Sequence, residues 1–168
     1  MSAPARVLVI GVGNRMRHDD GAGLEVVERA RRRLPAAVAV AECGEDATAL
    51  LDAWEGAEFA VLVDAARWAG AEPGEVAWIP DVDAAPVVLP GWGGALGTHG
   101  LGVPEALQLG RALGRLPARL SVLAVALDDP QLGPGLSPRV EAAVDRAAQL
   151  LVDRVRSLVA APLPGEEA

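Results

Sequence analysis

The chain contains few aromatic residues, a single cysteine and fewer basic than acidic residues. The aromatic residues are four tryptophans and one phenylalanine, with no tyrosine, so the core must be built mostly from Ala, Val and Leu. The lone cysteine, Cys43, excludes an internal disulfide and a metal site made of several cysteines. The formal net charge of −8 argues against nucleic acid or an anionic membrane surface as a partner.

Targeting and membrane segments are also missing from the sequence. The opening residues, MSAPAR, do not lead into the apolar segment of a signal peptide. No apolar run approaches the ~20 residues that cross a bilayer. No repeat or interdomain linker divides the 168 residues. We therefore expect a cytoplasmic, monomeric protein with a single domain over residues 1–160 and a disordered tail at 161–168.

The pattern of apolar residues predicts an α/β fold. Apolar runs at 6–10, 38–41, 59–63 and 120–127 predict strands, and the weaker run at 75–79, closed by Pro80, predicts an edge strand. Helical spacing predicts helices at 23–34, 47–54 and 104–114, and a last helix from 138 onwards. This alternation predicts three layers: a mostly parallel, twisted five-stranded sheet with helices on both faces.

Polar side chains follow the first and third strands, and one histidine falls in the long Gly/Pro-rich segment 80–102. The first strand breaks at Gly11 into a glycine-rich turn that carries Asp19 and Asp20, and Asp64 directly follows the third strand. His99 lies in the long segment. In open α/β sheets, ligands bind beyond the carboxyl ends of the strands. If these two strands are parallel, the three sites share one edge of the sheet.

One interpretation of the first turn is a dinucleotide-binding loop. Gly11 and Gly13 match two glycines of the G-x-G-x-x-G pattern, but the third position is Met16. Adjacent carboxylates would also repel a pyrophosphate. The acidic residue expected after the second strand has a candidate in Glu42. A nucleotide- or small-ligand-binding α/β domain therefore stays open as an alternative. Nucleophilic catalysis has less support, because no G-x-S-x-G motif is present and Cys43 has no flanking signature.

A metal site is the second interpretation. Asp20, Asp64 and His99 offer two carboxylates and one imidazole, which is the layout of a hydrolytic site with an open position. Mixed oxygen and nitrogen ligands suit ions such as Zn, Ni, Mn or Fe. Each residue taken alone has a structural explanation, such as a helix cap or a strand end. Only their expected position at one edge favours a shared metal.

Four motifs resemble those of the NiFe-hydrogenase maturation endopeptidases, and the resemblance covers nearly the whole chain. They are Gly11-x-Gly-Asn14 followed by Asp19-Asp20-Gly-x-Gly23; Leu62-Val63-Asp64-Ala65; Thr98-His99-Gly100 ahead of a helix; and Leu136-Ser137-Pro138 opening the last helix. The resemblance implies a twisted sheet flanked by helices. It also implies an endopeptidase that removes the C-terminal extension of the hydrogenase large-subunit precursor after nickel insertion.

The same resemblance implies the residues that do the work. Asp20, Asp64 and His99 take the positions of the family's metal-binding and catalytic residues, and Asp19 would support them or cap a helix. The resemblance further implies that nickel is carried by the substrate and serves as the recognition element. The sequence departs from the family at Cys43-Gly44-Glu45-Asp46, where relatives often have a Gly-Gly-Thr-like turn. A non-catalytic chaperone of the large subunit is a further alternative.

Overall fold

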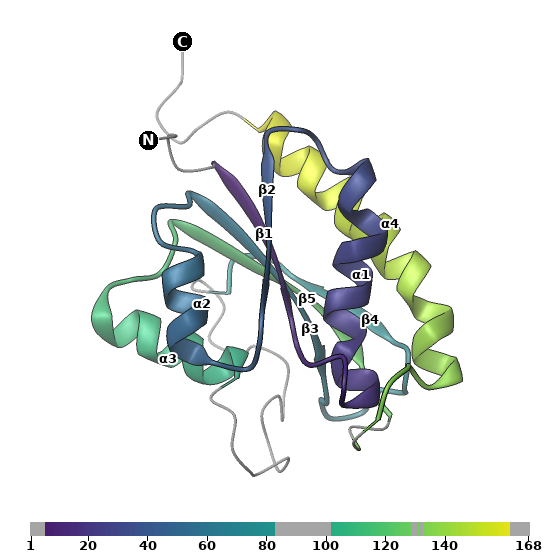
Figure 1. Ribbon diagram of the computed structural model, residues 1–168. Helices are drawn as coiled ribbons and strands as arrows, with labels where there is room; N and C mark the ends of the chain where they lie inside the picture. Colours follow the sequence, from purple (N-terminus) through teal and green to yellow (C-terminus); the bar gives the residue numbers. More distant parts are fainter. Residues whose placement is uncertain (1–5, 83–101, 129–130, 132, 162–168) are drawn as a thin grey trace.

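One sheet runs through the centre of the computed structural model, which describes residues 6–82, 102–128, 131 and 133–161 (Figure 1). Within these residues the sheet has five strands in the order β2-β1-β3-β5-β4. The parallel strands are β1 (Val7–Val12), β2 (Val38–Cys43), β3 (Phe59–Ala66) and β5 (Arg119–Ala126). The edge strand β4 (Val76–Ile79) is antiparallel to β5. The predicted mostly parallel, five-stranded sheet is confirmed.

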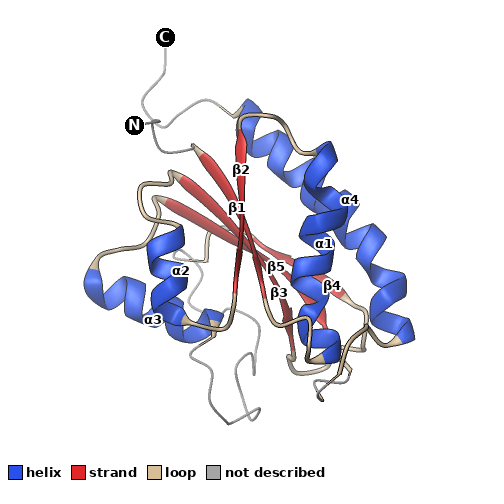
Figure 2. Cartoon of the chain, viewed as in Figure 1, coloured by secondary structure: helices blue, strands red, loops and turns tan. Residues whose placement is uncertain are grey.

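Helices cover both faces of this sheet, as predicted (Figure 2). One face carries α1 (Ala22–Ala30) and α4 (Pro138–Ala160), and the other carries α2 (Ala47–Ala53) and α3 (Val103–Leu113). Each face has its own apolar core of buried Val, Leu and Ala side chains. No helix in the described part of the chain is long and apolar enough to cross a membrane.

The start of α1 packs unusually closely on the ends of β1 and β3. A Cβ atom on Gly23 would lie 2.3 Å from the carbonyl oxygen of Val63 and 2.7 Å from that of Val12. Only glycine therefore allows the helix to begin at this point. The loop between β1 and α1 is held directly over the carboxyl ends of the two central strands.

The structure corrects the predicted position of Asp64. The sequence placed this residue after the third strand, but β3 continues through it to Ala66. The pairing of Asp64, Ala65 and Ala66 with consecutive residues of β5 explains the extension, because a parallel partner keeps the backbone in the ladder past the apolar run. Asp64 alternates with Leu62 and Ala66, which belong to the core under α2 and α3, so its side chain faces that side.

Other differences are confined to element ends. β2 extends to Cys43, two residues beyond the predicted strand. The predicted helix at 23–34 is α-helical only to Ala30 and then tightens into a 3-10 turn, η2 (Arg31–Arg33), whose arginines are exposed. His99, most of the long segment 80–102 and residues 162–168 of the predicted tail lie outside the described residues.

Candidate active site

The loop after β1 closes into a short 3-10 helix, η1 (His18–Gly21), that presents two buried carboxylates. Gly13 has a φ of 139°, and a Cβ at this position would lie 2.0 Å from the backbone oxygen of Asp20. The turn is also tied internally, because the Asn14 side-chain oxygen accepts from the Met16 amide at 2.9 Å. The sharp turn after the first strand therefore requires glycine at position 13.

Asp20 and Asp64 meet at the carboxyl edge of the sheet. Asp20 is 7% exposed and Asp64 is 8% exposed. Burial is the largest cause that raises the pKa of both carboxyl groups, and it brings the pKa of Asp20 to about 7. The charge of Asp20 further raises the pKa of Asp64, well above its ordinary value. The structure therefore brings together two of the three site residues that the sequence predicted.

A third carboxylate, Glu45, joins them from the loop between β2 and α2. The proximity of Glu45 raises the pKa of Asp20, and its charge also raises the pKa of Asp64. Arg17 lies beside it, with Nη1 3.6 Å from Oε2 of Glu45, and lowers the pKa of Asp20. Glu45 was not predicted to belong to the site. The sequence feature that marked its loop was the departure from the Gly-Gly-Thr-like turn of the family.

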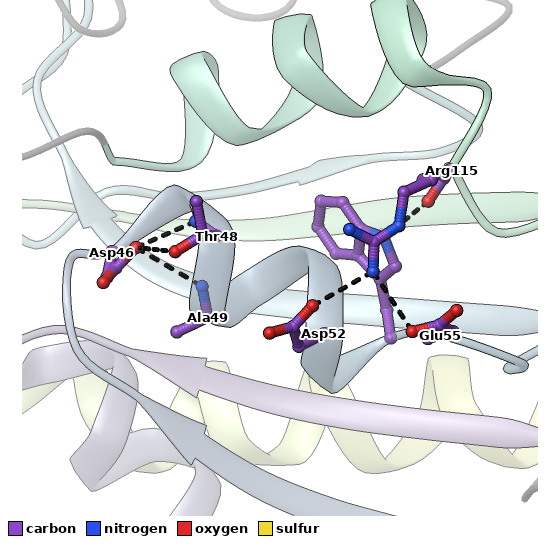
Figure 3. Close-up of polar contacts among 7 residues, drawn as sticks. Asp46, Thr48, Ala49, Asp52, Glu55 and Arg115 are labelled. Carbon is purple, nitrogen blue, oxygen red and sulfur yellow. Dashed lines mark hydrogen bonds and ion pairs between the residues drawn. The ribbon is translucent and has the colours of Figure 1, made fainter.

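The next residue, Asp46, has a different role (Figure 3). Its side chain is the N-cap of α2: Oδ1 accepts from the amides of Thr48 at 2.8 Å and Ala49 at 3.3 Å, and from the Thr48 hydroxyl at 2.7 Å. These hydrogen bonds lower the pKa of Asp46. Of two adjacent acids, one is committed to the helix and the other to the carboxylate cluster.

Asp19 anchors η1 to the far end of the chain. It is fully buried, and its carboxylate accepts from the Ser137 amide at 2.6 Å, from the Ser137 hydroxyl at 2.8 Å and from the Asp128 amide at 2.9 Å. Ser137 is the N-cap residue of α4 with Pro138 next, as predicted, but its hydroxyl makes no cap hydrogen bond to the helix. The supporting role implied for Asp19 is therefore to fix the turn that presents Asp20.

Residues 133–135 hold the other side of η1. The backbone amide of His18 donates to the carbonyl of Gly133 at 2.8 Å, and the Gly133 amide donates to the carbonyl of Met16 at the same distance. Nδ1 of the His18 ring lies 3.1 Å from the Gly135 carbonyl oxygen. The short helix is thus fixed through its backbone as well as through Asp19.

A pocket of about 350 Å³ opens beside the carboxylate cluster. It is lined by Gly13, Asn14, Arg15, Leu24, Glu42, Cys43, Gly44 and Glu45. Glu42, the candidate ribose ligand of the dinucleotide interpretation, instead accepts two hydrogen bonds from Arg15, at 2.9 and 3.0 Å. Burial raises the pKa of the Cys43 thiol, so this residue is not an activated thiolate. Glu42 and Arg15 thus neutralise each other at the wall of the pocket.

Asp20 and Asp64 are two of the three predicted ligands of a divalent cation, and the third, His99, lies outside the described residues. Oδ2 of Asp20 is buried and lacks a hydrogen-bond partner in the described part of the chain. The described residues alone do not form a group of three His, Cys, Asp or Glu side chains arranged to hold a metal. A buried, unpaired carboxylate oxygen among other carboxylates is costly, and a cation bound there would offset that cost.

Known proteins with a similar sequence are named as hydrogenase maturation or formation proteins. The chain is 32% identical over 161 residues to the hydrogenase expression/formation protein HupD of Rhodobacter capsulatus, covering 92% of this chain and 73% of that one. It is 26% identical over 163 residues to the hydrogenase 2 maturation protease of Escherichia coli K12, covering 96% and 97%.

Solved structures show the same likeness. The E. coli hydrogenase maturating endopeptidase HybD superposes with a TM-score of 0.73 at 25% identity, covering 91% of this chain and 93% of that one. HybD from Thermococcus kodakarensis superposes with a TM-score of 0.67 at 25% identity, covering 89% and 99%. The fold together with these likenesses therefore places the chain among peptidases.

The particular family follows from the sequence model of the hydrogenase maturation proteases, which matches residues 24–154. The chain belongs to the hydrogenase maturation protease family. The predicted family and the predicted peptidase activity are confirmed.

Proposed function

We propose that this peptidase removes the C-terminal extension of a NiFe-hydrogenase large-subunit precursor once nickel has been inserted. The observation that carries the proposal is the unpartnered, buried Oδ2 of Asp20 beside the carboxyl groups of Asp64 and Glu45. Family membership supplies the substrate class, since a relative is named as the maturation protease of hydrogenase 2.

In this proposal the nickel ion belongs to the substrate. Asp20, Asp64 and His99 bind the ion when the loaded precursor docks, which fixes the scissile peptide beside the carboxylates. A precursor without nickel presents no cation, and its docking leaves the carboxylates buried and unpaired. Cleavage then acts as a checkpoint, because only a loaded substrate neutralises the site.

The chemistry is the hydrolysis of one peptide bond. A water molecule adds to the scissile carbonyl carbon, its proton passes to a carboxylate of the site, and the C–N bond breaks as the leaving amine takes up a proton.

The direct test is the mass of the large subunit after incubation with the protein. We expect wild type to shorten the nickel-loaded precursor and to leave the nickel-free precursor intact. Asp20→Ala, Asp64→Ala and His99→Ala should each abolish cleavage. Asp52→Ala is the matched control, because Asp52 is exposed on α2 and pairs with Arg115 (Figure 3). Wild-type cleavage by two of the three site variants would contradict the assignment.

The same experiment separates the alternatives. Binding of the precursor without loss of its extension is the result expected of a chaperone. A thermal shift with NAD or ATP, and none with nickel, is the result expected of a nucleotide-binding domain.

A further inference from the structure

His18 differs from the rest of the site turn in having a left-handed backbone. Its φ is 43°, and among the described residues only Asp81 is another non-glycine residue with a positive φ. This conformation is uncommon for residues with a Cβ, although histidine adopts it more readily than most. His18 is the first residue of η1, which presents Asp20 two residues later. The direction in which the chain enters η1 is therefore set at His18.

The ring of His18 contacts two glycines of a segment that is distant in the sequence. Nδ1 lies 3.1 Å from the carbonyl oxygen of Gly135, and because a carbonyl oxygen only accepts, Nδ1 carries the proton of this hydrogen bond. The Nε2 edge of the ring packs on Gly133, where a Cβ would lie 2.6 Å from Nε2 and 2.8 Å from Cε1. The φ of Gly133 is 143°. Both the backbone and the packing of the ring therefore require glycine at position 133.

We infer that His18 is a positioning residue of the peptidase: its ring holds η1 against residues 133–135 and thereby fixes the carboxylate of Asp20 in the site. This inference rests on the proposed function, since it takes Asp20 as a residue that acts on the substrate. Its support is the hydrogen bond to Gly135 and the packing on Gly133.

The position of the Asp20 carboxylate depends on the backbone that carries it. Oδ2 is buried and has no hydrogen-bond partner in the described part of the chain, so no such bond at that atom holds the group in place. The Asp20 amide donates to the Arg17 carbonyl at 3.0 Å, which ties Asp20 to the start of η1. A displacement of about 1 Å at a reacting group can slow an enzyme about a hundredfold. Loosening η1 at His18 should therefore impair cleavage.

A purely structural role would lead to a different result. The His18 ring is half-buried and its hydrogen bond is exposed, so losing the ring should cost the whole fold little stability. Without the ring, η1 keeps the hydrogen bonds between Asp19 and Ser137 and the backbone hydrogen bonds to Gly133. Loss of the ring should thus loosen the turn locally while the remainder stays folded.

The first test compares three substitutions in the full chain. His18→Asn keeps a side-chain N–H donor and tolerates a left-handed backbone, His18→Gly keeps only the backbone freedom, and His18→Ala keeps neither. We expect His18→Asn to cleave the nickel-loaded precursor at close to the wild-type rate, and the other two to be slower by about tenfold or more. Cleavage by His18→Gly at the wild-type rate would overturn the inference, because the ring would then be dispensable.

Arg156→Ala is the matched control for these variants. Its side chain also donates to a backbone carbonyl, that of Arg33 at 3.2 Å, but this contact lies at the opposite end of α1 from η1. We expect Arg156→Ala to cleave the precursor at the wild-type rate. Equal slowing of Arg156→Ala and His18→Gly would overturn the positioning role, since any lost side-chain contact would then have the same effect.

Hydrogen exchange without substrate is a second readout that does not depend on the proposed function. In His18→Gly, the amides of Asp20 and Gly133 should exchange about tenfold faster than in wild type, because the turn opens more often. The Phe59 amide, which donates to the Arg6 carbonyl at 2.9 Å, should keep its wild-type rate. Unchanged exchange at Asp20 and Gly133, or equal acceleration at Phe59, would overturn the inference. Faster exchange confined to the turn, in a protein whose wild type leaves the precursor intact, supports the role of the ring and contradicts only the proposed function.

Discussion

Asp19 and Ser137 are joined by two hydrogen bonds across 118 residues of sequence, from the serine amide at 2.6 Å and from its hydroxyl at 2.8 Å. Asp19 sits in η1, immediately before the buried Asp20, and Ser137 opens α4. The position of the site turn is therefore set by the last helix of the fold as well as by the strand that precedes it.

Replacing Asp19 with Asn should destabilise the protein strongly. The amide group of Asn would direct its N–H donors at amides that now donate to Asp19, leaving buried groups unsatisfied. We expect a loss of about 2 to 4 kcal/mol in the free energy of unfolding, measured by urea denaturation. Asp52→Asn, at an exposed ion pair, should cost less than about 1 kcal/mol. Similar losses for the two variants would contradict the anchoring role of Asp19.

Ser137→Ala removes the hydroxyl donor but keeps the amide that also binds Asp19. We expect a loss of about 1 to 2 kcal/mol. A double-mutant cycle with Asp19→Asn should show that the two losses do not add, because both variants break the same contact. Ser157→Ala, on the same helix, is the matched control: its hydroxyl donates to the Asp153 carbonyl within α4. If the losses in the free energy of unfolding add, the side chains of Asp19 and Ser137 do not stabilise each other.

The stability of the metal-free protein should fall as the pH rises towards neutrality. The pKa of Asp20 is about 7 in the fold against an ordinary value of 3.8. Between these values the folded protein holds a proton that the unfolded chain has released, so the free energy of unfolding decreases with pH across this window. The raised pKa of Asp64 acts in the same direction.

Asp20→Asn isolates this effect, because the variant cannot titrate at the position. We expect its urea midpoint to overtake that of wild type as the pH increases from about 4 to about 8 in the presence of a chelator. Asp52→Asn should keep the wild-type pH profile. A constant difference between Asp20→Asn and wild type at all pH values would rule out the raised pKa.

Gly13→Ala should disrupt the site turn. The backbone at Gly13 has a φ of 139°, and the added Cβ would lie 2.0 Å from the Asp20 carbonyl oxygen. Both effects oppose any side chain, so we expect a loss of about 3 kcal/mol or more in the free energy of unfolding. Gly44→Ala, whose Cβ would meet nothing within 4 Å, should change stability by less than about 0.5 kcal/mol. Thermal unfolding of both variants is the measurement.

The sequence predicts the sheet and the edge at which Asp20 and Asp64 meet. These predictions succeed because each strand is a continuous apolar run and because parallel strands place their carboxyl ends together. The position of Asp64 inside β3 could not be predicted, since it depends on pairing with β5 rather than on the local pattern. Glu45 was missed for a similar reason: its neighbour Asp46 carries a local helix-cap signal, but Glu45 affects the pKa of Asp20 only because the fold brings the two residues near each other.

The anchoring of η1 also determines when the active site can form during synthesis. The residues of η1 are made long before their buried partner, because Ser137 lies 118 residues beyond Asp19. The central strand β3 likewise waits for its neighbour β5. The buried carboxylates are therefore anchored only after Ser137 has left the ribosome, so a nascent chain that stops short of Ser137 lacks this anchor of the site turn.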